Sequence, residues 1–458
     1  MDDGNPIALL GRGLKISIHW PDRILGPRPG LREVNLACWA MFVAFLIVPV
    51  CVVFWLHFQT GSGSIRKLHS DFVYFYGVGQ IAHQYSAVRV YDFVLQQKTF
   101  NQIYPLRTYG PSPYPPFVAL FFSLFARMSF EMAYLLWALV SLALYTVGIA
   151  VIAHEVFPGN RLKTSLIFCF ALAFYPFSLE TLMNGQLSAI AVCAVGLAIS
   201  QETHLKTFRS GLALSMLAYK PTLLLLILPM LLLTRRFKSL LGFMTGAVVL
   251  MLVATAWAGV LIWPTYWSFL RGFGHFAGLG GQSALRLWQF VDFRSLYYAV
   301  AGGRSKVLLA ALICLGATIG TWLVMLLYKS AAGEKPEQYL AWAVTLTWTL
   351  LLNVYVPIYD SVLVTIAVLL TLGALRDTPW STASGWTIAL SILILLSSRV
   401  TESIAQRHGI QLLSILIAFL GFGQLYLLHL LVRKNRRNNY RHTPCQLAAE
   451  KYLLLKIE

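Results

Sequence analysis

The sequence contains little charge and very little acid. Only 12% of its 458 residues are charged, whereas soluble globular proteins average about 25%. Aspartate and glutamate together number 18. Hydrophobic residues make up 58% of the chain and the mean hydropathy is +0.67, which excludes an ordinary water-soluble fold. The sequence therefore predicts a membrane protein.

Cysteine is also scarce, and its placement excludes a disulfide framework. Five of the six cysteines fall inside apolar segments and the sixth lies in the basic tail: Cys38, Cys51, Cys169, Cys193, Cys314 and Cys445. No CxxC metal motif is present, so no metal site and no other cofactor is expected. A cleavable leader is not expected either, because some 33 mostly polar residues precede an apolar run too long for a signal peptide.

Apolar segments recur from position 34 to position 432, and they predict helices. The first, 34–56, has 23 residues. As a helix it would cover about 34 Å against a hydrocarbon core of roughly 30 Å. The others are 115–127, 131–153, 164–182, 187–200, 211–233, 240–262, 307–328, 339–356, 361–375, 384–399 and 411–432.

We expect an all-α polytopic membrane protein with 11–13 transmembrane or part-spanning helices. Several segments are shorter than the roughly 17 residues of a full span, which indicates half-helices or re-entrant pieces. The predicted organisation is a cytoplasmic segment 1–33, one membrane domain 34–432 and a basic cytoplasmic tail 433–458. Two large exported loops, 58–113 and 263–306, interrupt the domain, and short interfacial helices are expected in the first.

The formal charge of +18 is concentrated at chain ends and short connectors. Short loops rich in Lys and Arg stay cytoplasmic, so both termini are predicted to lie inside. The tail can also contact anionic lipid headgroups. This placement disfavours nucleic-acid binding, and the sequence indicates no protein partner. The residues concerned are Arg12, Lys15, Arg23, Arg28, Arg32, Arg235, Arg236, Lys238, Arg433, Lys434, Arg436, Arg437 and Arg441.

The side of the membrane on which the connector 184–186 lies depends on how the short segments are counted. If each segment crosses, this connector is cytoplasmic. If 211–233 is two half-helices meeting at Lys220 and Pro221, and 115–127 is re-entrant, the connector and Lys220 are outside. The second topology is mildly favoured, because it leaves the basic connectors 160–163 and 204–209 in the cytoplasm.

Asp71 lies about 15 residues after the first predicted span, in SDFVYFYGVGQ. Three interpretations are open: a solvated loop acid, the N-cap of a helix starting at Phe72, or a general base at the membrane surface. Asp92, in RVYDF, is better explained as a partner of Arg89 or as a helix cap.

Lys220 stands in an otherwise apolar segment, next to Pro221. Burying an ammonium in a membrane costs roughly 2.5–3.5 kcal/mol on insertion scales, so such residues carry functional hypotheses. Proline breaks the helix here and brings the ammonium near headgroup depth. Two hypotheses are equally supported, namely binding of a lipid-linked phosphate and structural pairing.

Three further groups of polar residues are candidates for the site. Asn184 and Gly185 form a strong turn dipeptide, but a turn does not account for Gln186. Arg271, His275 and Arg286 supply cations and a titratable ring to the second loop, or are simply solvated there. Tyr355, Tyr359 and Asp360 lie between two apolar segments, where an aromatic belt with a cap is the alternative.

Four motifs occur in an order that resembles glycosyltransferase family 87: DFVYFYGVGQIAHQYSAVRVYD, YPPFVALFFSLFARM, MNGQLSAI and GLALSMLAYKPTLLLLILPMLLLTRRFK. The resemblance covers roughly positions 35–375. It implies a fold of the GT-C superfamily and transfer of a sugar, mannose in the family, from a polyprenyl phosphate donor. Members with the mannosyltransferase assignment often carry Pro followed by Trp and histidines at the late outer boundary, where this chain has Tyr359 and Asp360.

The resemblance implies that Asp71 is the catalytic base and that Lys220 lies near the donor. Because a sugar phosphate has a good leaving group, one base and cations on the phosphate suffice, without the paired carboxylates of a glycosidase. Arg271 and Arg286 are the additional phosphate candidates. Substrate contacts are expected from Tyr74, Tyr114, Asn184, Gln186, His275, Tyr359 and Asp360.

The expected partners are the lipid-linked donor, a lipid or glycan acceptor and membrane lipids. We expect the protein in a bacterial inner membrane with its active site on the outer face. A multi-spanning transporter or flippase is the alternative, although transporters often show two matching halves and the two large loops are unlike each other. A non-catalytic lipid-binding subunit is a third reading, and it would not depend on Asp71.

Overall fold

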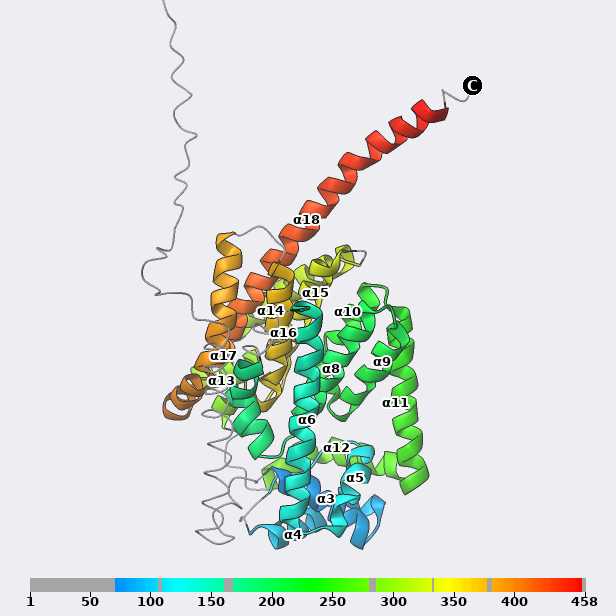
Figure 1. Cartoon of the computed structure of the whole chain (residues 1–458). Helices are drawn as coiled ribbons and strands as arrows, with labels where there is room; N and C mark the ends of the chain where they lie inside the picture. Colours follow the sequence, from blue (N-terminus) through cyan, green and yellow to red (C-terminus); the bar gives the residue numbers. More distant parts are fainter. Residues whose placement is uncertain are drawn as a thin grey trace, which may run out of the picture.

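The computed structural model describes residues 71–105, 109–159, 168–279, 286–331, 333–376 and 381–454, with side chains described up to 435 and not for 276–279. All regular structure in these ranges is helical except for one isolated bridge between Phe290 and Pro357. The first predicted span, 34–56, lies outside the described residues, as do Cys38, Cys51 and the basic residues before position 34. Figure 1 shows a bundle of long helices with a layer of shorter helices at one end.

Six described helices are long and apolar enough to cross a membrane, or seven if one bent pair is a single span. The protein is therefore a multi-pass membrane protein, as predicted. The six are α6 (Phe130–Val156), α11 (Phe237–Ala258), α14 (Lys306–Lys329), the continuous pair η8 (Ile358–Val362) and α16 (Leu363–Arg376), α17 (Thr382–His408) and the first part of α18 (Leu412–Leu454).

Central and peripheral helices differ in how much of their surface other helices cover. Of the most apolar window, 89% is buried in Ile358–Arg376 and only 11% in Lys306–Lys329. The first segment forms the core with α15 (Lys335–Leu351) and α8 (Ser188–Thr203), all three rich in buried residues. The second exposes apolar side chains such as Val307 and Ile313, as expected of a face in contact with lipid.

Two helices are broken, and both breaks lie at the same end of the bundle. The π-helical η4 (Pro176–Met183) meets α8 at an angle of 119°. The segment 207–233 consists of α9 (Thr207–Ser215), η5 (Met216–Tyr219), η6 (Pro221–Leu224) and α10 (Ile227–Leu233). The predicted break at Lys220 and Pro221 is confirmed, because proline cannot donate the hydrogen bond that would continue the helix.

Close helix packing fixes the position of α8 against α6. A Cβ added to Gly148 would lie 2.6 Å from the carbonyl oxygen of Val192, and one added to Gly196 would lie 2.6 Å from that of Gly148. Small residues allow such backbone approach in membrane bundles. The turn before α8 is thereby held beside the start of α6.

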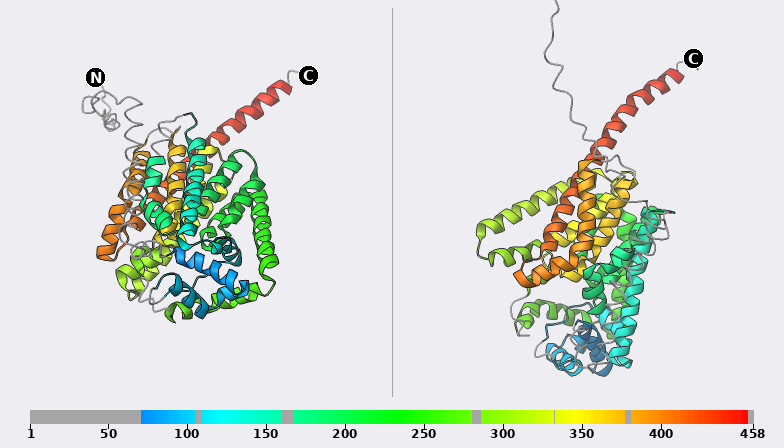
Figure 2. Two further views of the ribbon diagram at one scale, coloured as in Figure 1. Left: turned by 60° about the horizontal axis from the view of Figure 1, so that its bottom comes forward. Right: turned by 60° about the vertical axis from the view of Figure 1, so that its left-hand side comes forward.

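A layer of shorter helices covers the end of the bundle at which the breaks lie (Figures 1 and 2). It has its own hydrophobic cluster, in which Val73, Tyr91 and Phe100 pack with Ile262 and Phe269. Its members are α3 (Phe72–Gln84), η2 (Ala87–Tyr91), α4 (Phe93–Ile103), α5 (Pro116–Ser123), η3 (Phe125–Arg127) and α12 (Ile262–Leu279). The short helices expected between 58 and 113 are present in the described part of that range.

The second predicted exported loop, 263–306, contains helices that were not predicted. It contains nearly all of α12, followed by η7 (Leu287–Gln289) and α13 (Phe293–Ala301). Aromatic residues on one side of α12 pack on the end layer. The segment Phe290–Asp292 runs against 354–357, where Val291 N donates to Val356 O at 2.9 Å.

Candidate functional site

Asp71 occupies the N-cap position of α3, but its side chain does not cap the helix. It instead accepts a hydrogen bond from Gln186 Nε2 at 2.8 Å. Asp92 behaves differently, because it caps α4 through Leu95 N at 3.1 Å and pairs with Arg89 at 2.8 Å, as predicted. The carboxylate of Asp71 is thus directed to the 184–186 turn, 115 positions further along the chain.

The 184–186 turn is held against α3 and α6 by its backbone. Asn184 O accepts from Phe72 N at 3.0 Å, and Gly185 O accepts from Trp137 Nε1 at 2.9 Å. Gly185 has φ +76°, and a Cβ there would lie 2.7 Å from Phe72 Cβ, so glycine is required twice over. These contacts are incompatible with a topology that separates the turn from Asp71, and they agree with the predicted alternative in which both lie on one side.

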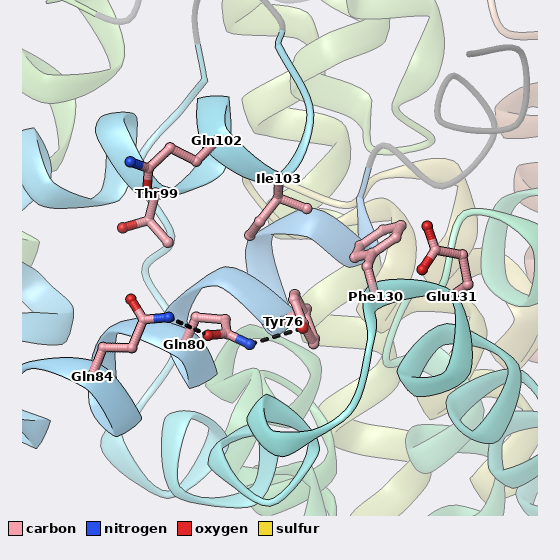
Figure 3. A pocket seen from close by; sticks show the side chains of 8 residues that line it. All are labelled: Tyr76, Gln80, Gln84, Thr99, Gln102, Ile103, Phe130 and Glu131. Carbon is pink, nitrogen blue, oxygen red and sulfur yellow. Dashed lines mark hydrogen bonds between the residues drawn. The ribbon is translucent and has the colours of Figure 1, made fainter. Parts of the chain in front are cut away.

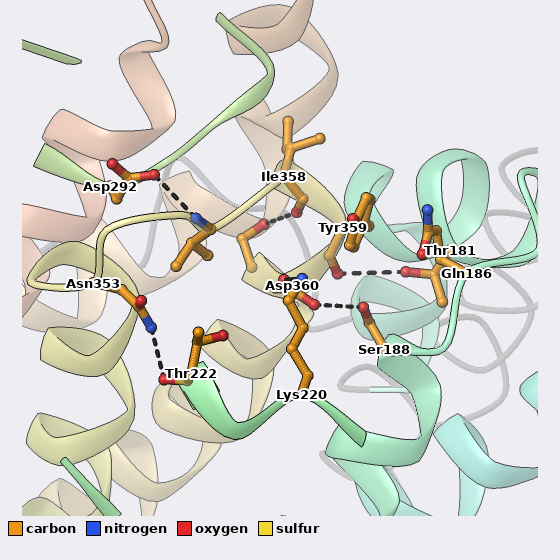
Figure 4. A network of polar contacts seen from close by, with 12 residues as sticks. Thr181, Gln186, Ser188, Lys220, Thr222, Asp292, Asn353, Ile358, Tyr359 and Asp360 are labelled. Carbon is orange, nitrogen blue, oxygen red and sulfur yellow. Dashed lines mark hydrogen bonds and ion pairs between the residues drawn. The ribbon is translucent and has the colours of Figure 1, made fainter. Parts of the chain in front are cut away.

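Lys220 pairs with Asp360 in the centre of the site (Figure 4). The two side chains are 12% and 1% exposed, respectively. The second oxygen of Asp360 accepts from Ser188 Oγ at 2.8 Å, at the start of α8. Asp360 is therefore not a solvated cap at the membrane boundary, which was the alternative, but a buried carboxylate with two partners.

Three tyrosines surround the charged pair. The Lys220 ammonium lies 4.9 Å from the ring centroid of Tyr359 and 5.9 Å from that of Tyr355, within the range of cation–π attraction. Tyr114 is hydrogen-bonded to Tyr359 and lies close enough to both Asp71 and Asp360 to feel their charges. The two carboxylates thus belong to one site, with aromatic rings beside them.

Burial changes the acid–base behaviour of this site. Burial raises the pKa of Asp71 above its ordinary value, and the hydrogen bond from Gln186 partly offsets this by stabilising the carboxylate. The pKa of Tyr114 is raised well above 10, first by burial and then by Asp360, Tyr355 and Asp71. Tyr114 therefore remains a neutral hydrogen-bonding group, whereas Asp71 becomes a stronger base than a solvated aspartate.

Two buried polar atoms at the site have no hydrogen-bond partner within the described residues. They are Gln186 Oε1 and Thr222 Oγ1, the first on the side chain that holds Asp71 and the second two residues after Lys220. Buried polar groups in proteins are almost always paired, so each such atom needs an explanation. Each of these oxygens can accept a hydrogen bond from a bound hydroxyl group.

The structure gives contacts elsewhere for two of the four other residues predicted for the site. The Tyr74 hydroxyl accepts from Gly110 N at 3.2 Å, and its ring packs on Phe100. The exposed Arg271 guanidinium lies 5.6 Å from the Trp267 ring centroid on α12. His275 and Arg286 are exposed on either side of the range 280–285, which lies outside the described residues.

Several residues that organise the site were not singled out from the sequence. Glu180 accepts from Asn184 Nδ2 at 3.1 Å and from the Tyr175 hydroxyl at 3.0 Å. Asn353 Nδ2 donates to Thr222 O at 2.7 Å, which satisfies a carbonyl next to the helix break. Asp292, buried, accepts from Val356 N at 3.0 Å. Of these residues, only Glu180 could have been recognised from the sequence, because it is an acid inside an apolar segment.

Within the described ranges, no group of three or more His, Cys, Asp or Glu side chains is placed to hold a metal ion.

Comparison with known proteins gives one match. The model of glycosyltransferase family 87 matches residues 113–354, slightly more than half of the chain. The matched region includes Tyr114, the 184–186 turn and Lys220, and it ends before Tyr359 and Asp360. No curated protein and no solved structure matches the chain.

Proposed function

The chain belongs to glycosyltransferase family 87, and we propose that it transfers mannose from a polyprenyl phosphate donor to a hydroxyl group of a lipid or glycan acceptor. The observation that supports this most is the direct contact between Asp71 and Gln186, because it combines a carboxylate of raised pKa with a buried amide oxygen that no described residue pairs. This is what a site needs if it must hold a sugar hydroxyl and take its proton.

In this mechanism Asp71 is the general base. It accepts the proton of the acceptor hydroxyl while the oxygen attacks the anomeric carbon of the donor. The bond from that carbon to the phosphate oxygen breaks, and polyprenyl phosphate leaves with the electron pair. Attack from the side opposite to the phosphate inverts the anomeric carbon, so that a β-linked donor gives an α-glycoside.

Charge at the site bears on where the donor phosphate lies. Asp71 and Asp360 carry two negative charges and Lys220 one positive charge, so the cluster cannot by itself neutralise a phosphate. We therefore propose that Lys220 contacts the phosphate together with Arg271 or Arg286, the cations that flank 280–285. Cations directed at a leaving group stabilise the charge that develops there in the transition state.

The site is proposed to face the outer side of a bacterial inner membrane. Helix α8 begins at Ser188, beside Asp360, and ends at Thr203. At that far end Glu202 pairs with Arg236 of the basic connector 235–238. Because basic connectors stay in the cytoplasm, this arrangement favours an outward-facing site and cytoplasmic termini.

The proposal is tested with purified full-length protein in detergent and synthetic polyprenyl phosphate sugars that differ only in the head sugar. Products on a lipid or oligosaccharide acceptor are identified by mass spectrometry, and the anomeric configuration by NMR. We expect transfer from the β-mannosyl donor and an α-linked product. Transfer from another sugar alone would overturn the mannose assignment, and a β-linked product would overturn the inverting mechanism.

A further inference from the structure

A second polar cavity lies in the end layer, outside the Asp71 site. It has a volume of about 280 Å³ and is formed between α3, α4 and the start of α6 (Figure 3). Its walls carry the amides of Gln80, Gln84 and Gln102, the hydroxyls of Tyr76 and Thr99, the carboxylate of Glu131, and two apolar side chains, Phe130 and Ile103. None of these residues was a candidate from the sequence.

We propose that this cavity binds a neutral sugar unit of the glycan acceptor, at some distance from the hydroxyl that is glycosylated. This inference rests on the proposed glycosyl transfer for its biological role, but not for the binding itself. The site would add a glycan-binding subsite to the enzyme and would favour acceptors longer than one sugar.

The chemistry of the cavity wall selects the class of ligand. Glu131 is the single charged residue among those that line the cavity, and none of them is Lys or Arg, which disfavours phosphate and carboxylate ligands. Side-chain amides offer a donor and an acceptor side by side, which matches neighbouring sugar hydroxyls. Phe130 offers an apolar surface to the C–H face of a sugar ring. A few polar groups in fixed positions beside apolar ones are typical of small-ligand sites.

The polar side chains on α3 are held in place before any ligand binds. Gln80 Nε2 donates to the Tyr76 hydroxyl at 2.8 Å and to Ala126 O at 2.7 Å. Gln84 Nε2 donates to Gln80 Oε1 at 2.7 Å, and the Tyr76 hydroxyl donates to Met128 O at 2.7 Å. Such fixed geometry reduces the entropy cost of binding. Gln84, Gln102 and Glu131 are exposed at the mouth, so a ligand can enter from outside.

The cavity is linked to the catalytic site through Phe72. Its ring lies 5.5 Å from the Phe130 ring and 6.1 Å from the Tyr76 ring, and its backbone N–H is bonded to Asn184. Asp71 precedes Tyr76 by five residues, which is about 7.5 Å along the axis of α3.

Binding is tested without donor, so that the result does not depend on catalysis. The full-length protein is titrated with free α-linked mannotriose, and contact is read by saturation-transfer NMR. We expect signals from the wild type that weaken in Gln102→Ala. The matched controls are His83→Ala on α3 and Lys98→Ala on α4, exposed residues that do not line the cavity, and we expect both to bind as the wild type does.

A kinetic arm then connects the cavity with transfer. Loss of one hydrogen bond in Gln102→Ala should raise the KM for a trisaccharide acceptor roughly three- to tenfold more than the KM for a single-sugar acceptor. Equal effects on both acceptors, with unchanged mannotriose signals, would overturn the proposal. If the wild type transfers no sugar but binds mannotriose through Gln102, the proposed function fails and the glycan site stands.

Substitutions of Glu131 distinguish a sugar from the main competing ligand, which is the ammonium headgroup of a membrane lipid. Glu131→Gln keeps hydrogen-bonding capacity but removes the charge, whereas Glu131→Ala removes both. Binding of mannotriose should be lost in the alanine variant and largely retained in the glutamine variant. Equal loss of mannotriose binding in both variants, or displacement of mannotriose by phosphatidylethanolamine vesicles, would contradict a neutral sugar site.

Discussion

Gln186 donates its side-chain amide to the Asp71 carboxylate at 2.8 Å, and the same amide keeps its oxygen buried without a partner among the described residues. One side chain therefore holds the proposed base and also carries an acceptor for a hydrogen bond from a ligand. The 184–188 segment joins the site together, since Asn184 bonds the start of α3, Gln186 bonds Asp71 and Ser188 bonds Asp360.

The hydrogen bond from Gln186 predicts a pH effect. Asp71 acts as a base only when ionised, so activity falls as the pH drops through its raised pKa. Gln186→Leu removes a donor that stabilises the carboxylate, which raises this pKa further. The acidic limb of kcat/KM should move to higher pH. Gln424→Leu, which removes another buried amide that donates to Thr371, should leave the limb in place. An unmoved limb in Gln186→Leu would contradict the contact.

The Lys220–Asp360 pair allows the two hypotheses for Lys220 to be separated. Lys220→Met leaves a buried carboxylate unpaired, which costs about 3–5 kcal/mol. Lys220→Met/Asp360→Leu removes both charges and should recover most of the thermal stability. If Lys220 also contacts the donor phosphate, the donor KM stays raised in the double variant. Recovery of both stability and donor KM would show that the lysine is only a structural partner of Asp360.

Glu180 is expected to act as a positioning residue for the turn. Glu180→Ala leaves the Asn184 amide and the Tyr175 hydroxyl without their acceptor, at about 1–3 kcal/mol for each donor that remains buried. Glu180→Gln keeps an acceptor for Asn184. A loss of about 1.4 kcal/mol of transition-state stabilisation lowers kcat about tenfold. We expect kcat to fall at least about tenfold in the alanine variant and to recover in the glutamine variant. Equal kcat in both variants would exclude this role.

Substitution of Gly185 by alanine should cause a steric clash. The same substitution at Gly409 serves as the control for the backbone effect alone. Gly185 and Gly409 have φ +76° and +74°, so alanine costs about 1–2 kcal/mol of backbone energy at either. Only at Gly185 would the new Cβ meet another atom, Phe72 Cβ at 2.7 Å, whereas nothing lies within 4 Å at Gly409. Thermal unfolding should therefore start lower in Gly185→Ala than in Gly409→Ala. Equal thermal unfolding midpoints in the two variants would show that a Cβ at position 185 does not clash with α3.

The fold could be predicted where one local property decides it. The apolar segment 131–153 became α6, Phe130–Val156, and the break at Lys220 followed from the proline after it. By contrast, no helix was predicted within 263–306, where the structure has α12, whose aromatic residues pack on the end layer. This helix contacts η2 and α5, and no local sequence pattern reveals such contacts.

The site could be predicted in its residues but not in its pairings. Asp71, Gln186, Lys220 and Asp360 were all recognised as unusual polar residues in apolar or aromatic surroundings. Their partners were not, since Lys220 and Asp360 are 140 positions apart and two topologies placed the 184–186 turn on opposite sides. Ser188, Asn353 and Asp292 are ordinary residues in the sequence, and they gain importance only from the groups they contact.

The central claim, that Asp71 is the base of a glycosyl transfer, is tested most directly by the turnover of Asp71→Asn. The substitution keeps the size and hydrogen-bonding capacity of the side chain but removes its basicity. Transfer from the polyprenyl phosphate mannose donor is measured at saturating substrate, with thermal unfolding as the check that the variant is folded. We predict a folded protein without measurable transfer. A folded variant that retains more than about a tenth of wild-type turnover, a loss of less than about 1.4 kcal/mol in transition-state stabilisation, would contradict the account.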